Sequence, residues 1–182
     1  MRDDIPRLVD GPLGQNHDGT MKCVELKSGW SHLVARVQVK MSLARDDHVN
    51  RIQVLGWGRS DKGQLGCLDK SVCKPQPLPG LHEAMSSSSL SSPKTTISQV
   101  ACGSESTYLL TTDNNTLWSC GWNEHGNLGV AATDDEENVA TISRVLGTER
   151  IVSPATYTTN TNGDTKLLMA AGGAHFLVMK TS

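Results

Sequence analysis

The chain has few aromatic residues and no long apolar run, and both shortages limit what it can be. Aromatic residues make up 4% of its 182 residues, so a large core would depend on Leu, Val, Ile, Ala and Gly. No apolar stretch reaches the roughly 20 residues that cross a bilayer. The polar N-terminus, residues 1–6, does not resemble a signal peptide. We therefore expect a cytoplasmic or nuclear protein that does not enter a membrane.

The chain also lacks an excess of positive charge and the cysteine spacing of a zinc site. A net charge of −2 gives no general attraction to nucleic acid, so we expect no direct binding to it. Cys67 and Cys73 do not form a Cys-x-x-Cys pair. We expect no metal and no cofactor, and free thiols that are mostly buried. The five cysteines are Cys23, Cys67, Cys73, Cys102 and Cys120.

What the chain does have is a Gly-rich sequence that occurs twice. Residues 121–129 read GWNEHGNLG and residues 58–66 read GRSDKGQLG, each after a short apolar stretch typical of a strand. The Gly-x4-Gly spacing also begins a phosphate-binding loop, but Gln64 and Asn127 stand where that loop needs Lys. Nucleotide binding is therefore not expected there, and the two copies indicate a repeat protein.

A second pattern, strand, Gly turn and strand, occurs three times. Its copies cover residues 23–35, 97–110 and 167–179. Aligning their turn glycines places three polar residues at one position, namely His32, Ser106 and His175. Because a repeated position rarely forms one catalytic site, we expect each histidine to make a structural hydrogen bond within its own unit.

The two patterns divide the chain into two full units and a half unit. A lead-in over 1–21, which could end an earlier repeat, precedes repeat units over 22–73, 97–130 and 165–182. Loop insertions are expected over 74–96, which is rich in Pro and Ser, and over 131–164. The acidic run 134–137 is expected to be solvated or to meet a basic partner, and a charged loop is expected at 40–48. No stretch has convincing helical periodicity.

These features resemble the regulator of chromosome condensation repeat family, whose members form β-propellers. Residues 100–103, Val-Ala-Cys-Gly, and residues 57–66, with the pattern Trp-Gly-x4-Gly-Gln-Leu-Gly, match the family pattern. Ser60, Ser106 and Cys120 depart from the usual Asn, His and Trp. The resemblance covers about residues 22–182 and implies an all-β fold, a partial β-propeller of two to three blades.

Within the family, residues 121–126 most resemble the last full repeat of two relatives. One is the yeast α-tubulin suppressor protein and the other is the secretion-regulating guanine-nucleotide exchange factor. A complete family member has about seven blades, so the resemblance implies the C-terminal part of a larger ring or a shortened chain. An open arc of blades would leave sheet faces unburied, and self-association is then expected.

The resemblance implies a regulatory protein-interaction module rather than an enzyme, and three hypotheses stay open. The first partner is a small zinc-binding electron carrier used in diphthamide synthesis and transfer-RNA wobble modification. The second is a small GTPase such as Ran, for which the chain would act in nucleotide exchange. The third hypothesis is a truncated fragment without independent function.

The tip of the second Gly-rich turn is the candidate partner-binding site. It consists of Trp122, Asn123, Glu124 and His125. Exposed loop residues are where binding residues concentrate. Trp122 is the tryptophan expected to be most exposed, because Arg59 stands at the matching position of the other copy. Trp30, Trp57 and Trp118 are expected to pack within the blades.

Overall fold

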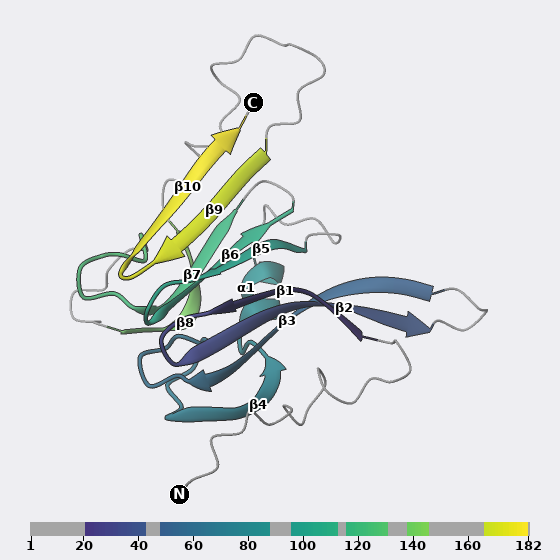
Figure 1. Ribbon diagram of the computed structural model, residues 1–182, viewed down its shortest axis with the longest axis horizontal. Helices are drawn as coiled ribbons and strands as arrows, with labels where there is room; N and C mark the ends of the chain where they lie inside the picture. Colours follow the sequence, from purple (N-terminus) through teal and green to yellow (C-terminus); the bar gives the residue numbers. More distant parts are fainter. Residues whose placement is uncertain are drawn as a thin grey trace, which may run out of the picture.

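The computed structural model describes residues 21–42, 48–87, 96–112, 116–130, 138–145 and 166–181, and they form three antiparallel sheets that lie side by side (Figure 1). The first sheet, unit 1, has the order β1-β2-β3-β4, the second, unit 2, β5-β6-β7-β8, and the third, unit 3, β10-β9. The elements are β1 Met21–Ser28, β2 His32–Ser42, β3 His48–Arg59, β4 Ser71–Pro77, α1 Leu81–Ser87, β5 Ile97–Cys102, β6 Ser106–Thr111, β7 Leu117–Trp122, β8 Asn138–Arg144, β9 Lys166–Gly172 and β10 His175–Thr181.

Units 1 and 2 repeat each other in register as well as in order. His32 pairs with Gly58 in unit 1, and Ser106 pairs with Gly121 in unit 2. Gly58 and Gly121 have φ values of 103° and 122°, in the region that favours glycine. A Cβ atom at Gly121 would overlap the backbone of the β5–β6 turn, as one at Gly58 would overlap the β1–β2 turn. These glycines therefore let the third strand of each unit pass close to the first turn.

Hydrophobic side chains fill the space between consecutive units. Alternate residues of β6 point to opposite sides: Leu109 belongs to the core shared with unit 1, and Tyr108 and Leu110 belong to the core shared with unit 3. Two-sided burial explains why β6 is buried along its whole length. Antiparallel sheets packed face to face in this way are the arrangement of propeller blades, so the expected all-β partial propeller is observed.

Two segments that the sequence assigned to loops contain regular structure. Strand β4 and helix α1 occupy the first part of segment 74–96, and β8 lies within segment 131–164. Pro75 and Pro77 are compatible with β4 because it is the edge strand of its sheet. Helix α1 forms because Leu81, Ala84 and Met85 share one face and pack against the core between units 1 and 2. At seven residues, α1 is too short for the periodicity that the sequence reading required.

Strands β2 and β3 also extend into the charged segment 40–48, since Ser42 pairs with His48. Residues 1–20, 43–47 and 113–115, which include most of the expected lead-in, lie outside the described residues. Within the described part of the chain, no helix is long and apolar enough to span a bilayer.

All five cysteines are free, as expected, but they are not mostly buried. Cys102 and Cys120 are buried and Cys67 is half-buried, whereas Cys23 and Cys73 are exposed. Burial raises the pKa of both Cys102 and Cys120 to about 12, so these two thiols stay protonated and are poor nucleophiles. The exposed pair lies on β1 and β4, the edge strands of the first sheet among the described residues.

Candidate protein-binding surface

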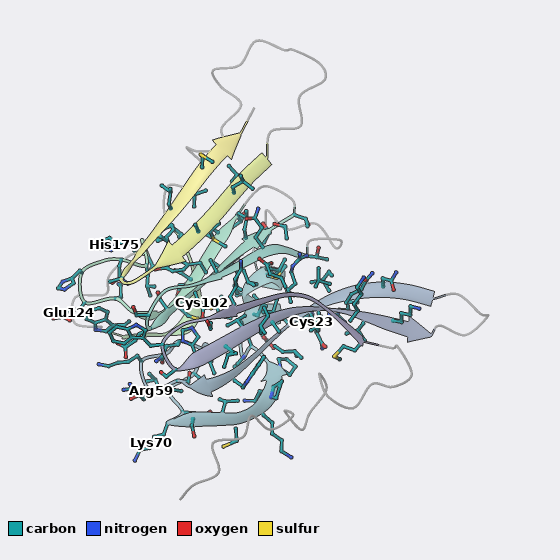
Figure 2. All side chains as sticks on the ribbon, in the orientation of Figure 1. Cys23, Arg59, Lys70, Cys102, Glu124 and His175 are labelled. Atoms are coloured by element: carbon teal, nitrogen blue, oxygen red, sulfur yellow. The ribbon has the colours of Figure 1, made fainter. Side chains whose placement is uncertain are left out.

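The strand connections at one end of the three sheets are hydrogen-bonded to one another, and we call this group of turns the turn rim. It consists of residues 29–31, 59–66, 103–105, 122–129 and 172–174. In Figure 2 the labelled side chains of Arg59, Glu124 and His175 all lie along this side of the molecule. The rim is the part of the structure where irregular backbone from all three units meets.

Backbone hydrogen bonds link the short turns of the rim from one unit to the next. The Trp30 N–H donates to the Ser104 carbonyl at 3.0 Å, and the Ser104 N–H donates to the Gly173 carbonyl at 2.7 Å. Trp30, Ser104 and Gly173 are matching positions of the repeat, so the same contact occurs twice. Backbone groups therefore hold these short turns together, whichever side chains the turns carry.

A buried polar network beneath the rim joins unit 1 to unit 2. The Thr107 hydroxyl donates to the Gln64 carbonyl at 2.7 Å and lies 3.2 Å from His32 Nε2. The Cys120 thiol donates to the same carbonyl, at 3.6 Å. Since Thr107 uses its proton on Gln64, its oxygen is left to accept from His32. The sequence predicted that His32 forms its hydrogen bond within its own unit. This prediction is wrong, because the His32 side chain contacts Thr107 of unit 2.

His32 is held neutral in this network. Its side chain is 1% exposed, and burial lowers its pKa to about 4, with a hydrogen bond to the Ser106 backbone offsetting part of the effect. A Cβ atom at Gly29 would overlap the His32 ring, so glycine is needed where the β1–β2 turn covers the imidazole. At neutral pH, His32 therefore acts as a structural group under the rim and is neither a charge nor a catalytic base. The matching His175 is exposed on β10.

The outer surface of the rim carries one highly exposed tryptophan beside a group of charges. The Trp30 side chain is 82% exposed. Arg59, whose N–H donates to the Ser31 carbonyl, forms ion pairs with Asp61 and with Glu105 of unit 2. The hydrogen bond between Arg59 and Asp61 raises the pKa of Arg59 and lowers the pKa of Asp61, so both stay charged. Trp30 and Arg59 thus lie on neighbouring turns of one surface.

The candidate site predicted from the sequence lies in the next turn of the same rim. Trp122 is half-buried and meets the His125 ring edge to face, with ring centroids 5.6 Å apart, and Glu124 and His125 are exposed. Asn123 is 5% exposed, and its Oδ1 accepts the Leu128 N–H at 3.0 Å. Ser60 Oγ accepts the Leu65 N–H in the same way at the matching position. The turn therefore brings all four residues together, but the Asn123 side chain already serves the turn itself.

The candidate surface contains no metal centre within the described residues. None of their His, Cys, Asp and Glu side chains form a group of three or more that could hold a metal ion. The chemistry available on the rim is that of aromatic, charged and backbone groups. Such a surface is suited to contact with another macromolecule.

Comparison with known proteins identifies the repeat. Two models of the regulator of chromosome condensation (RCC1) repeat match residues 53–110 and 97–127. Two secretion-regulating guanine nucleotide exchange factors, from Mus musculus and Bos taurus, are 30% identical to the chain over 135 and 131 residues. The chain is an RCC1-repeat protein. The family resemblance found in the sequence is thereby confirmed.

The chain matches only part of each of these longer proteins. The matched region of each exchange factor is 69% of this chain and 24% of the relative, so the chain spans about a quarter of the length of these relatives. The crystal structure of human WBSCR16 matches 87% of this RCC1-repeat chain and 32% of its own, with a TM-score of 0.53 and 22% identity. That structural likeness supports the fold.

Trp30 is the rim residue that sequence reasoning missed. Trp118 is buried, as expected, and Trp57 is half-buried against the cores, but Trp30 was assigned to packing and is instead the most exposed of the large apolar side chains among the described residues. The signal was available in the RCC1 repeats themselves. The matching residues are Ser104 and Gly173, and a position that accepts serine and glycine is not a core position.

Proposed function

We propose that this RCC1-repeat chain is a protein-binding module of a regulatory protein, in the cytoplasm or the nucleus, and that its turn rim contacts the partner. The observation that carries the proposal is the exposure of Trp30 beside Arg59 on a rim whose backbone is fixed by hydrogen bonds. Trp and Arg are enriched among the residues that dominate binding energy at protein interfaces. A rigid backbone beneath them reduces the entropy lost on binding.

The predicted tip residues extend this surface. The Glu105 carbonyl accepts the Trp122 N–H at 2.9 Å, and the Glu105 carboxylate lies 3.6 Å from Arg59, so Glu105 connects the Arg59 turn to the Trp122 turn. We assign Trp122, Glu124 and His125 to the contact surface. Asn123 supports the turn from within, because its side-chain oxygen is already used.

Two partners are proposed in order of preference. The first is the small zinc-binding electron carrier of diphthamide synthesis and transfer-RNA wobble modification, which follows from the resemblance of residues 121–126 to the yeast α-tubulin suppressor protein. The second is a small GTPase such as Ran. The names of the two relatives, secretion-regulating guanine nucleotide exchange factors, favour this second candidate.

Binding measurements with both purified proteins test the proposal. The chain is immobilised, and the affinities of the zinc protein and of nucleotide-free Ran are compared for wild type, Trp30→Ala and the double variant Trp122→Ala, His125→Ala. Leu177→Ala, at a residue 66% exposed on β10 and outside the rim, is the matched control. We expect one of the two proteins to bind, and Trp30→Ala to weaken it about 30-fold, the effect of a hot spot worth about 2 kcal/mol.

The outcomes separate the hypotheses. Binding of the zinc protein alone supports the first partner, whereas binding of nucleotide-free Ran alone supports the second. Absence of binding by either protein rejects both partners and favours a fragment without independent function. Equal affinity of the wild type and all rim variants would reject the rim as the contact surface, whichever protein binds.

A further inference from the structure

A second repeated contact lies away from the rim, between the edge strands of consecutive units. β1, β5 and β9 each form one edge of their sheet. The Glu25 carboxylate on β1 accepts the Val100 N–H of β5 at 3.3 Å. The Gln99 side chain on β5 accepts the Met169 N–H of β9 at 3.0 Å and donates to the Leu167 carbonyl at 2.5 Å. Each contact joins a side chain of one unit to the backbone of the next.

The alignment of the repeats shows that these two contacts are the same contact. The 74-residue offset that aligns Gly29 with Gly103 also aligns Glu25 with Gln99. The next offset, of 69 residues, aligns Val100 with Met169. Both donors therefore occupy one repeat position, and both acceptor side chains occupy the position before it.

A β-bulge accompanies the contact in both units. The register between β1 and β2 shifts between Cys23 and Glu25, and the register between β5 and β6 shifts between Ile97 and Gln99. A bulge bends its strand and changes the direction of the side chains beside it. In unit 3 the pairing of β9 with β10 is continuous, and Leu168 stands at the position of Glu25 and Gln99.

We propose that Glu25 and Gln99 are directional joints, in which the side chain after each bulge binds the backbone edge of the next unit in place of a neighbouring strand. Unpaired edge groups otherwise invite pairing with other chains. Unit 3 lacks both the bulge and the polar side chain, so its β9 edge offers no joint of this kind to another unit. By the same rule, the β1 edge is the receiving side for a Gln or Glu side chain of another unit of this repeat type.

The exposure of matching side chains on β1, β5 and β9 supports joints that run from each unit to the next one along the chain. Leu26, the residue of β1 that matches Val100, is 53% exposed, whereas Val100 is 1% exposed. Leu168 is 38% exposed. A hollow of about 390 Å³ is lined by residues from β1, β2, β5 and β9, including Glu25, Gln99 and Leu168. Solvent therefore reaches the joints, and amide exchange can report on them.

Amide hydrogen exchange of the whole chain, read residue by residue by NMR, tests the proposal. The three matching amides are Leu26, Val100 and Met169. We expect Val100 and Met169 to be protected in the wild type and Leu26 to exchange rapidly. Gln99→Leu should lower the protection of Met169 about tenfold, consistent with the loss of one hydrogen bond. It should leave Val100 unchanged.

Further variants separate a local joint from general destabilisation. Glu25→Leu should release Val100 and not Met169. Gln99→Glu keeps an acceptor for the Met169 N–H but removes the donor to the Leu167 carbonyl, so it should preserve only part of that protection. Leu168→Gln is the matched control, because no described unit follows β9, and it should change none of the three amides.

Several results would overturn the inference. One is unchanged protection of Met169 in Gln99→Leu. Another is a fall in Met169 protection only in parallel with an amide far from the joint, such as that of Ala35, since this would indicate global unfolding. Strong protection of Leu26 in the wild type would show that the β1 edge is already occupied and would reject its role as a receiving edge.

Discussion

The two interfaces between units differ in how they combine apolar and polar contacts. Between units 1 and 2, the apolar core surrounds the buried network of His32, Thr107 and Gln64, and Arg59 adds an ion pair at the rim. Between units 2 and 3, Tyr108 and Phe176 stack with ring centroids 4.5 Å apart. Both interfaces thus share the same backbone contacts at the rim. The first also contains a buried titratable group, His32, whereas the second is dominated by aromatic packing.

Because of this difference, we expect different changes to weaken the two interfaces. Burying a neutral histidine makes the first interface sensitive to acid. The second depends on the volume and shape of its aromatic side chains, because close-packed interiors respond to the loss of even small groups. In an array whose units contact only their neighbours, a change at one interface is expected to act mainly there.

The largest expected effect is at the second interface. Tyr108 is 0% exposed, and its hydroxyl donates to the Asn127 carbonyl at 3.1 Å. Tyr108→Ala should lower the free energy of unfolding by about 3–5 kcal/mol, the range for large aromatic residues in cores. Urea denaturation measures it. Tyr108→Phe, which keeps the ring, should cost only about 1 kcal/mol. Equal losses in the two variants would show that the hydrogen bond, and not the packing, holds this interface.

The first interface should weaken in acid because of His32. Its pKa is about 4 in the folded chain against 6.5 in the unfolded chain, so the unfolded chain binds the extra proton between these values. The stability that depends on neutral His32 is fully present above pH 6.5. It falls as the pH decreases through this range, and below pH 4 none of this contribution is left. At about 1.36 kcal/mol per pKa unit, the total is about 3 kcal/mol.

Urea denaturation at several pH values between 7 and 4 measures this loss. The variant His32→Gln removes the titrating group and keeps a donor for Thr107, so the difference between the two pH profiles isolates His32 from the carboxylates. A wild-type profile that runs parallel to that of the variant would show that His32 does not titrate between these pH values.

Asn123 provides a smaller test, because the sequence placed it in the binding site and the structure gives it a role in the turn. Asn123→Ala leaves the buried Leu128 N–H without its acceptor and should cost about 1–3 kcal/mol. Asn123→Ser should recover part of this loss, since Ser60 accepts the matching N–H in unit 1. Thermal denaturation compares the three proteins. If Asn123→Ala keeps full stability but loses the partner, the residue belongs to the contact surface after all.

The repeated glycines and apolar strands predicted most of the fold. Gly58 and Gly121 carry conformations that other residues rarely adopt, so their spacing marked the units directly. Helix α1 was not predictable from its own seven residues, because it forms by covering a core that other segments create. The partners of His32 were equally hidden, since Thr107 is 75 residues away and the two meet only when the units stack.

The candidate site was predicted in part. Residues 122–125 do lie together at a turn, because a Gly-rich turn holds its own residues close in any fold. The neighbouring Trp30 and Arg59 could not be added to it from the sequence, since backbone contacts between units bring these turns side by side. Comparing the three copies position by position would have removed Trp30 from the core, and that comparison needs only the sequence.

The smallest effect on stability is expected at Trp30, and it separates binding from folding. The Trp30 side chain is 82% exposed and contributes to neither interface, because the hydrogen bond from Trp30 to Ser104 uses only the backbone. Trp30→Ala should therefore change the free energy of unfolding by less than about 0.5 kcal/mol. Urea denaturation, performed on the same samples as the binding measurements, checks this. A loss of affinity together with unchanged stability assigns Trp30 to the contact surface. A fall of more than about 1 kcal/mol in the free energy of unfolding would instead mean that the indole packs against part of the chain, because truncating an exposed side chain usually changes stability by less than this.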